Sequence, residues 1–230
     1  MARDLWVIEY EANEHLFFSP GLKGTEMKVS DSGSGDFLQA PVGNHPARCI
    51  KIIDIGTQEG EYAGKPTYRR QIVVMWELPT ETFKNKDDKD VPFVVSKWYT
   101  ASLSEKANLR ADLVNWRGRP FTDEELMGFE VKNILGKPCM VQVTHNEKGK
   151  AKVTAVSSVP KGFQVPDQVN EPVYFSLEKD EFDAAVFDTL GDFFQGKIKT
   201  TPEWAALHDK TKGPVKKAEH FDDMESDIPF

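Results

Sequence analysis

The fold class follows from residues 68–78, which run Tyr68-Arg69-Arg70-Gln71-Ile72-Val73-Val74-Met75-Trp76-Glu77-Leu78. β-Branched and aromatic side chains dominate this stretch, and such side chains favour strands. Successive side chains of a strand point to opposite faces, so two sets arise: Arg70, Ile72, Val74 and Trp76 on one face, and Arg69, Gln71, Val73 and Met75 on the other. We therefore expect a β-strand that carries Trp76 into the core with its apolar companions.

Two further strands are expected on either side of this one. Residues 48–56 are rich in isoleucine and end at a glycine, and residues 91–100 follow a polar loop at 84–90. The glycine-rich segment 59–66 is typical of the turn between the first two strands. The three segments predict an antiparallel meander.

The hydrophobic period then changes to that of a helix. Ser104 is a candidate N-cap and Gly118 a candidate stop, while Leu109, Leu113 and Trp116 have the spacing of one buried stripe. Thr122 and the glutamate three residues later match a capping box that opens a second short helix. We expect helices between the third and fourth strands.

Residues 138–145 and 150–159 complete the pattern as two more strands around a polar turn. Three strands, helices and two strands is the order of a five-stranded OB-fold Greek-key barrel. The predicted fold class is therefore mainly β, with this barrel, a helical C-terminal arm and a disordered acidic tail.

Four regions follow along the chain. Residues 1–40 form an N-terminal extension with a flexible Ser/Gly loop, and residues 41–160 form the barrel. Residues 161–209 form an arm with short helices at 183–190 and 202–208, whose many aromatic side chains need a packing partner. That partner is the barrel or, alternatively, a neighbouring molecule. Residues 210–230 form the tail.

Composition bounds the environment of the protein. The chain has 230 residues, 39% of them hydrophobic, and its net charge is −8. No apolar run approaches the ~20 residues that a membrane span needs, and no secretory signal is recognisable, so we expect a cytoplasmic protein. Five of the negative charges belong to residues 218–230, which leaves −3 on the rest and permits a local basic groove.

Cysteine and histidine patterns give no reason to expect a metal. Cys49 and Cys139 lie in apolar strand-like sequence and not in a Cys-x-x-Cys motif, which favours buried reduced thiols. The histidines are scattered without the spacing of metal ligands. We expect neither a metal nor a cofactor.

Two separate parts of the sequence resemble proteins that bind single-stranded DNA. The body, at 96–110, 116–119 and 133–139, is similar to a family of small phage-encoded OB-fold proteins taken to bind single-stranded DNA. The chain end, Asp227-Ile228-Pro229-Phe230, looks like the tip of bacterial and phage single-stranded DNA-binding proteins. The resemblance implies DNA binding without sequence specificity during replication, recombination or repair, and a place in the host bacterial cytoplasm.

Such binding needs cations that follow phosphates and flat side chains on which bases stack. Three segments combine both kinds of residue, at 68–70, at 97–99 and at 116–121. Lys106, Arg110 and Arg117 also fall within an arc of about 40° on the expected helix, although an ordinary solvated surface explains that row equally well. The predicted DNA contacts are Tyr68, Arg69, Arg70, Lys97, Trp98, Tyr99, Lys106, Arg110, Arg117 and Arg119. Alternation leaves open which of Trp98 and Tyr99 faces the DNA.

The tail is expected to have two roles. Asp227, Ile228, Pro229 and Phe230 combine negative charge, apolar side chains and the terminal carboxylate, which suits recruitment of replication, recombination or repair proteins. Asp222, Asp223 and Glu225 are expected to compete with DNA for the basic groove. Self-association on DNA is a further partner hypothesis.

The sequence also bears on two other classes of protein. An adaptor would use the barrel for protein contacts and the tail for recruitment, with no physiological DNA binding. An enzyme is not expected: residues 191–197 have the glycine and lysine spacing of a Walker A motif, but Ile198 replaces the hydroxyl residue and a helix pattern precedes them. No catalytic constellation is recognisable elsewhere.

Overall fold

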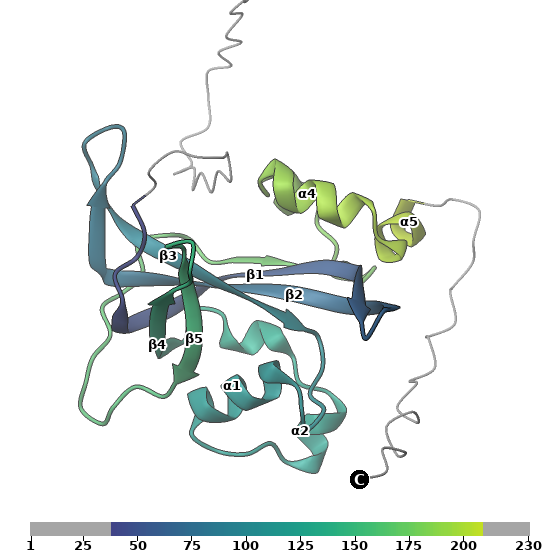
Figure 1. Cartoon of the computed structure of the whole chain (residues 1–230), viewed down its shortest axis with the longest axis horizontal. Helices are drawn as coiled ribbons and strands as arrows, with labels where there is room; N and C mark the ends of the chain where they lie inside the picture. Colours follow the sequence, from purple (N-terminus) through teal and green to yellow (C-terminus); the bar gives the residue numbers. More distant parts are fainter. Residues whose placement is uncertain (1–37, 209–230) are drawn as a thin grey trace, which may run out of the picture.

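Two long strands, β1 (Gly43–Tyr62) and β2 (Lys65–Lys84), form the centre of the fold. The computed structural model describes residues 38–208, and in this range helices cover both faces of a twisted sheet (Figure 1). The remaining strands are β3 (Asp90–Thr100), β4 (Pro138–His145), β5 (Ala151–Ser157) and β6 (Val173–Phe175). The helices are α1 (Asn108–Arg117), α2 (Asp123–Met127), the 3-10 helix η1 (Val131–Ile134), α3 (Ala184–Asp188), α4 (Asp192–Lys199) and α5 (Pro202–His208).

The strands form one six-stranded sheet of order β3-β2-β1-β4-β5, and the chain is mainly β as predicted. These strands pair antiparallel, whereas β6 runs parallel to β1 at residues 51–53. The sheet is not closed, because the end strands β3 and β5 share no backbone ladder in the described range. A side chain spans the gap: Lys97 Nζ donates a hydrogen bond to the Thr154 carbonyl oxygen at 3.3 Å.

The inner face of the sheet packs on α1. Leu109, Leu113 and Trp116 are all buried there, which confirms the predicted stripe. Trp76 also lies in this core, as predicted, with its ring centroid 6.2 Å from that of Trp116. The inner core thus depends on the helix that follows β3.

Two of the three predicted helix-end signals agree with the structure. Gly118 ends α1 with a left-handed φ of 67°, and Thr122 and Glu125 form the predicted capping box of α2. The N-cap prediction at Ser104 is wrong, because α1 begins at Asn108. The Ala107 amide donates to the Ser104 carbonyl oxygen, which places Ser104 in a separate turn before the helix.

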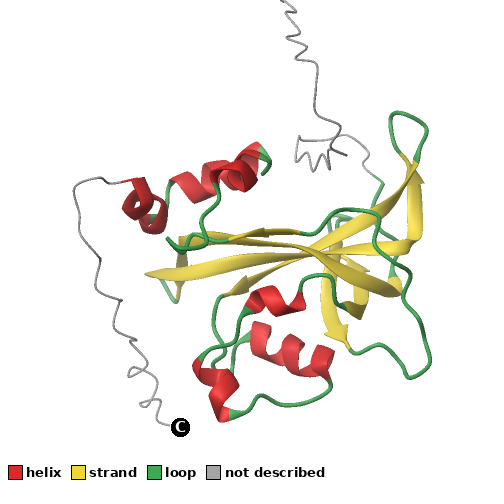
Figure 2. Cartoon of the chain, turned by 180° about the vertical axis from the view of Figure 1, so that it is seen from behind, coloured by secondary structure: helices red, strands yellow, loops and turns green. Residues whose placement is uncertain are grey.

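The outer face of the sheet forms a second core with the C-terminal arm. Side chains of β1 and β2 meet those of β6, α3 and α4 here; the buried members are Ile53, Ile55, Val73, Met75, Phe175, Leu177, Phe187, Leu190, Phe194 and Ile198. Figure 2 shows α4 and α5 on the opposite side of the sheet from α1 and α2. The aromatic residues of the arm therefore pack on the same molecule's sheet.

Charged side chains anchor the connector that leads to the arm. Glu77 is fully buried and accepts hydrogen bonds from the backbone amides of Val169 and Asn170 and from the Asn170 side chain. Arg48 donates to the carbonyl oxygens of Val165 and Pro166. These contacts satisfy buried polar groups and fix the path of the connector across the sheet.

Several expectations lie outside residues 38–208. They are the N-terminal extension with its Ser/Gly loop, apart from residues 38–40, and the acidic tail at 210–230. Within the described range, no helix is long and apolar enough to cross a membrane.

Gly56 allows the arm to approach β1 closely. Its φ is +70°, and a Cβ atom built on it would lie 2.8 Å from Thr201 Oγ1, at the start of α5. Gly64, at the β1–β2 turn, has a similar φ of +76° but nothing within 4 Å of such a Cβ. The two glycines share a backbone conformation and differ in surroundings.

We predict that Gly56→Ala destabilises the protein more than Gly64→Ala. Both substitutions impose the left-handed strain of about 1–2 kcal/mol, but only the first also pushes α5 away from the sheet. Guanidinium unfolding followed by tryptophan fluorescence should show an extra loss of about 1 kcal/mol or more for Gly56→Ala. Equal losses would contradict close packing of the arm on β1.

Candidate nucleic-acid interface

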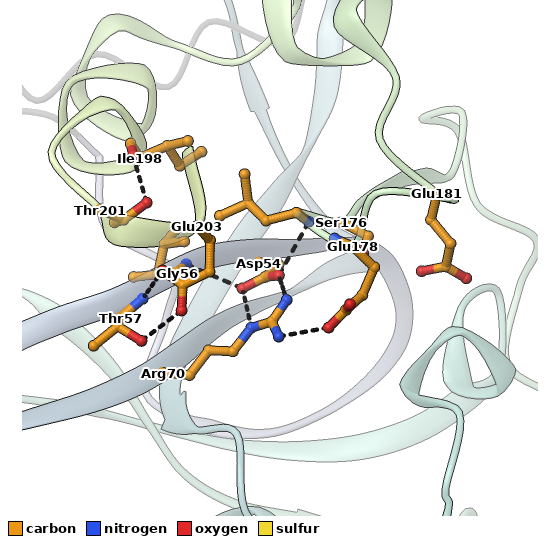
Figure 3. A network of polar contacts seen from close by, with 12 residues as sticks. Asp54, Gly56, Thr57, Arg70, Ser176, Glu178, Glu181, Ile198, Thr201 and Glu203 are labelled. Atoms are coloured by element: carbon orange, nitrogen blue, oxygen red, sulfur yellow. Dashed lines mark hydrogen bonds and ion pairs between the residues drawn. The ribbon is translucent and has the colours of Figure 1, made fainter. Parts of the chain in front are cut away.

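Arg70 belongs to a structural network and not to an open groove. It donates through Nε to Asp54 Oδ1 at 3.2 Å, pairs through Nη2 with Asp54 Oδ2, and pairs through Nη1 with Glu178 at 2.6 Å (Figure 3). Asp54 is buried and also accepts from the backbone amides of Gly56 and Leu177. This network joins β1 and β2 to the arm, so most of the charge of Arg70 is already neutralised.

Lys97 and Tyr99 point to the inner face and share one carboxylate. Lys97 Nζ lies 2.6 Å from Asp112 Oδ2, and the Tyr99 hydroxyl donates to the same oxygen at 2.7 Å. Burial, followed by the negative charge of Asp112, raises the pKa of Tyr99. Tyr99 is therefore the core member of the pair that the sequence left open, and Trp98 lies on the outer face.

The predicted row of helix cations is not one surface. Lys106 precedes α1, and Arg110 donates to the Leu103 carbonyl oxygen at 3.1 Å. Arg117 and Arg119 both pair with Glu125. Hydrogen bonds from Arg119, and next from the Thr122 backbone, lower the pKa of Glu125 to about 2.

The Glu125 pairs therefore stabilise the folded protein above pH 4.5, and the contribution is lost as the pH falls toward 2. These arginines are held by a carboxylate over the whole neutral range. The prediction that these cations form a continuous basic path is wrong, because Lys106 lies outside α1 and Arg117 is paired with Glu125.

Arg69 and Trp98 share the outer face. Trp98 pairs with Val73, so the two side chains point to the same face. Arg69 lies four residues before Val73 in β2, and side chains an even number of residues apart share a face. Four residues separate Arg69 from Val73, roughly 13 Å along the strand. Arg69 is exposed, and Trp98 retains 38% of its surface. The two residues therefore share one face of the sheet, at separate positions along the strands.

Tyr68 lies on the opposite face of the hairpin. It is 66% exposed, and its hydroxyl donates to Glu59 at 3.4 Å. The register pairs Glu59 with Tyr68 and Gln58 with Arg69, so the two neighbours point apart. The predicted cluster at 68–70 thus divides between two faces.

Alternation also separates the charges of the β1–β2 hairpin. Glu59 and Glu61 share the face of Tyr68, while Lys65 and Arg69 lie on the outer face. The outer-face residues from 56 to 71 are Gly56, Gln58, Gly60, Tyr62, Lys65, Thr67, Arg69 and Gln71, and none is acidic. Lys65 was missed at the sequence level because only strand register shows which face it shares.

The arm covers part of the face on which we expected DNA. Val73 and Met75 are buried in the outer core, beneath side chains that include Phe194. Phe194 also stacks on Trp98, with ring centroids 6.2 Å apart and an interplanar angle of 26°. On this face, Trp98 stays partly exposed, and so do Lys65 and Arg69 of the β1–β2 hairpin.

Both cysteines are buried thiols, as predicted. Cys49 and Cys139 are both buried and free, and burial raises the pKa of each thiol. In the described part of the chain, no group of three or more His, Cys, Asp or Glu side chains is arranged to hold a metal ion.

Comparison with known proteins assigns no family. No protein-family model matches the chain, and no curated protein matches it. A function is therefore proposed from the residues and their geometry.

We predict that two adjacent arginines differ sharply in their effect on stability. Arg70→Met leaves the buried Asp54 carboxylate without its main partner, and the expected loss is about 3 kcal/mol. Arg69→Met changes an exposed side chain and should alter stability by no more than about 0.5 kcal/mol. Chemical denaturation measures both; a stable Arg70→Met variant would show that the network is dispensable for folding.

Proposed function

We propose that the protein binds and protects single-stranded DNA without sequence specificity during phage DNA replication, recombination or repair. One observation carries the proposal: the exposed Trp98 and the exposed cations Arg69 and Lys65 lie on one face of β2 and β3, and none of the strand residues on this face from 56 to 71 is acidic. Each aromatic–base stack contributes about 1–3 kcal/mol and tolerates any base. Exposed cations farther along the same face attract phosphates whatever the base sequence.

An OB-fold barrel is the fold we propose for residues 41–160. The strand order β3-β2-β1-β4-β5 supports it, as does the position of α1 between β3 and β4. The remaining gap between β3 and β5 is spanned by the Lys97 hydrogen bond to Thr154. In this fold the strand 2–3 face is where oligonucleotides bind, which agrees with the place of Trp98 and Arg69.

The second candidate is a protein-interaction adaptor without physiological DNA binding. The ion pairs favour it, because Arg70, Lys97, Arg117 and Arg119 already have carboxylate partners. Burial of the middle of the outer face by the arm points the same way. Oligonucleotide binding distinguishes the two candidates.

The tail completes the proposal. Asp227, Ile228, Pro229 and Phe230 would recruit replication, recombination or repair proteins, and Asp222, Asp223 and Glu225 would compete with DNA for the basic surface. The whole protein would bind and not catalyse a reaction, and it would act in the cytoplasm of the host bacterium. Self-association on DNA is a further proposed interaction.

Fluorescence titration with an unstructured oligonucleotide tests the binding. We expect quenching of tryptophan emission and an affinity that falls as salt rises. Trp98→Ala should weaken binding about 5- to 150-fold, which corresponds to the loss of one stack. The absence of binding at low salt would refute the proposal and leave the adaptor.

Deletion of residues 221–230 tests the tail. It removes four carboxylate side chains, Asp222, Asp223, Glu225 and Asp227, so DNA binding should tighten, most clearly at low salt. The same deletion should abolish recovery of partner proteins in pull-downs. Unchanged DNA affinity would contradict competition, whereas partner recovery without the tail would contradict recruitment.

A further inference from the structure

We propose that helix α4 of the arm supplies part of the DNA site, as a platform on which one unpaired base stacks. The platform consists of Trp98 from β3 and of Phe193 and Lys197 from α4. It rests on the proposed function and adds two residues that sequence analysis did not assign to DNA binding. The ligand it would take is a flat nucleobase with a phosphate beside it.

The two rings meet across the junction of sheet and arm. The ring centroids of Trp98 and Phe193 are 6.1 Å apart, with an interplanar angle of 70°. Phe194 stacks beneath and is buried, and its ring lies 5.4 Å from that of Phe193. The buried ring fixes the other two, so the platform is held in position before any ligand arrives.

Folding alone does not account for the exposure of these rings. Phe194 and Ile198 turn toward the sheet and already fix α4 to it. Phe193 stays 48% exposed next to Trp98, which is 38% exposed. Large apolar side chains grouped at the surface mark binding sites more often than isolated ones do.

Lys197 gives the platform its charge. Its Nζ lies 5.8 Å from the Trp98 ring centroid and 5.6 Å from that of Phe193. Within residues 38–208, no carboxylate forms an ion pair with it. The ammonium group lies over both rings in the free protein, so a base that stacks on them takes its place, and the displaced cation can then meet the phosphate beside that base.

This arrangement changes the expected role of the arm. An arm that only covered the strand 2–3 face would oppose DNA binding, and detachment of the arm would strengthen DNA binding. A platform shared by β3 and α4 requires the arm to stay docked. DNA binding should then fall in variants that loosen the arm, such as Gly56→Ala.

The test uses the full-length chain and matched pairs of variants. Phe193→Ala and Lys197→Gln remove the platform; Phe163→Ala and Lys161→Gln are the controls, because Phe163 is 49% exposed and lies on the connector. The probe is a fluorescein-labelled oligothymidylate, measured by anisotropy over a range of salt. Thermal unfolding of each variant shows whether the fold is intact.

We expect Phe193→Ala to weaken binding about 5- to 150-fold, with the control within about 2-fold of the unmodified chain. Lys197→Gln should reduce the slope of log affinity against log salt by about 0.7. An abasic oligonucleotide of the same length offers nothing to stack, so the Phe193→Ala effect should disappear with it. Persistence of the effect on the abasic strand would mean that Phe193 only supports the fold.

The outcomes separate this proposal from the proposed function. If the unmodified chain binds no DNA, the proposed function fails. If it binds and Phe193→Ala behaves like Phe163→Ala, the platform alone is wrong. If Phe193→Ala changes the oligomeric state but not DNA affinity, a second copy of the chain is the occupant and the platform proposal is overturned.

Discussion

Burial of β1 and β2 on both faces is the constraint on which the rest of the structure depends. Ile52 points into the core with α1, whereas Ile53 and Ile55 point into the core with the arm. A strand that is apolar on both faces needs cover on both sides, so the central sheet cannot be stable with α1 alone. The arm is therefore part of the fold, and the Asp54–Arg70 pair and the close approach at Gly56 fix where it docks.

The same constraint divides the candidate DNA residues. Cations that point to the inner side, such as Arg70 and Lys97, meet carboxylates near the cores and stabilise the fold. Cations that point to the outer side, such as Arg69, stay exposed on the face of Trp98. The direction in which a basic strand residue points thus decides whether it meets a carboxylate or stays exposed. This division explains how a chain of net charge −8 can present a local surface suited to phosphates.

Local signals predicted most of the elements, and long-range contacts account for what was missed. Residues 138–145 coincide with β4, and Gly118 ends α1 where expected. The three residues of β6 all favour strands, but they are too few to show a period, and they pair because the arm returns to β1. Gly191 at the N-cap of α4 and Gly196 inside it concealed that helix. For the site, the sequence could not show that Arg70 pairs with Glu178, 108 residues away.

The central claim is that single-stranded DNA lies on the outer face of β2 and β3 beside α4. Photo-crosslinking with an oligonucleotide that carries 5-iodouridine, followed by mass spectrometry of the peptides, tests this most directly. The account predicts adducts at Trp98 and Phe193 and none at Tyr68, which lies on the other face of the hairpin. Adducts at Tyr68 without any at Trp98, or no adducts at all, would contradict it.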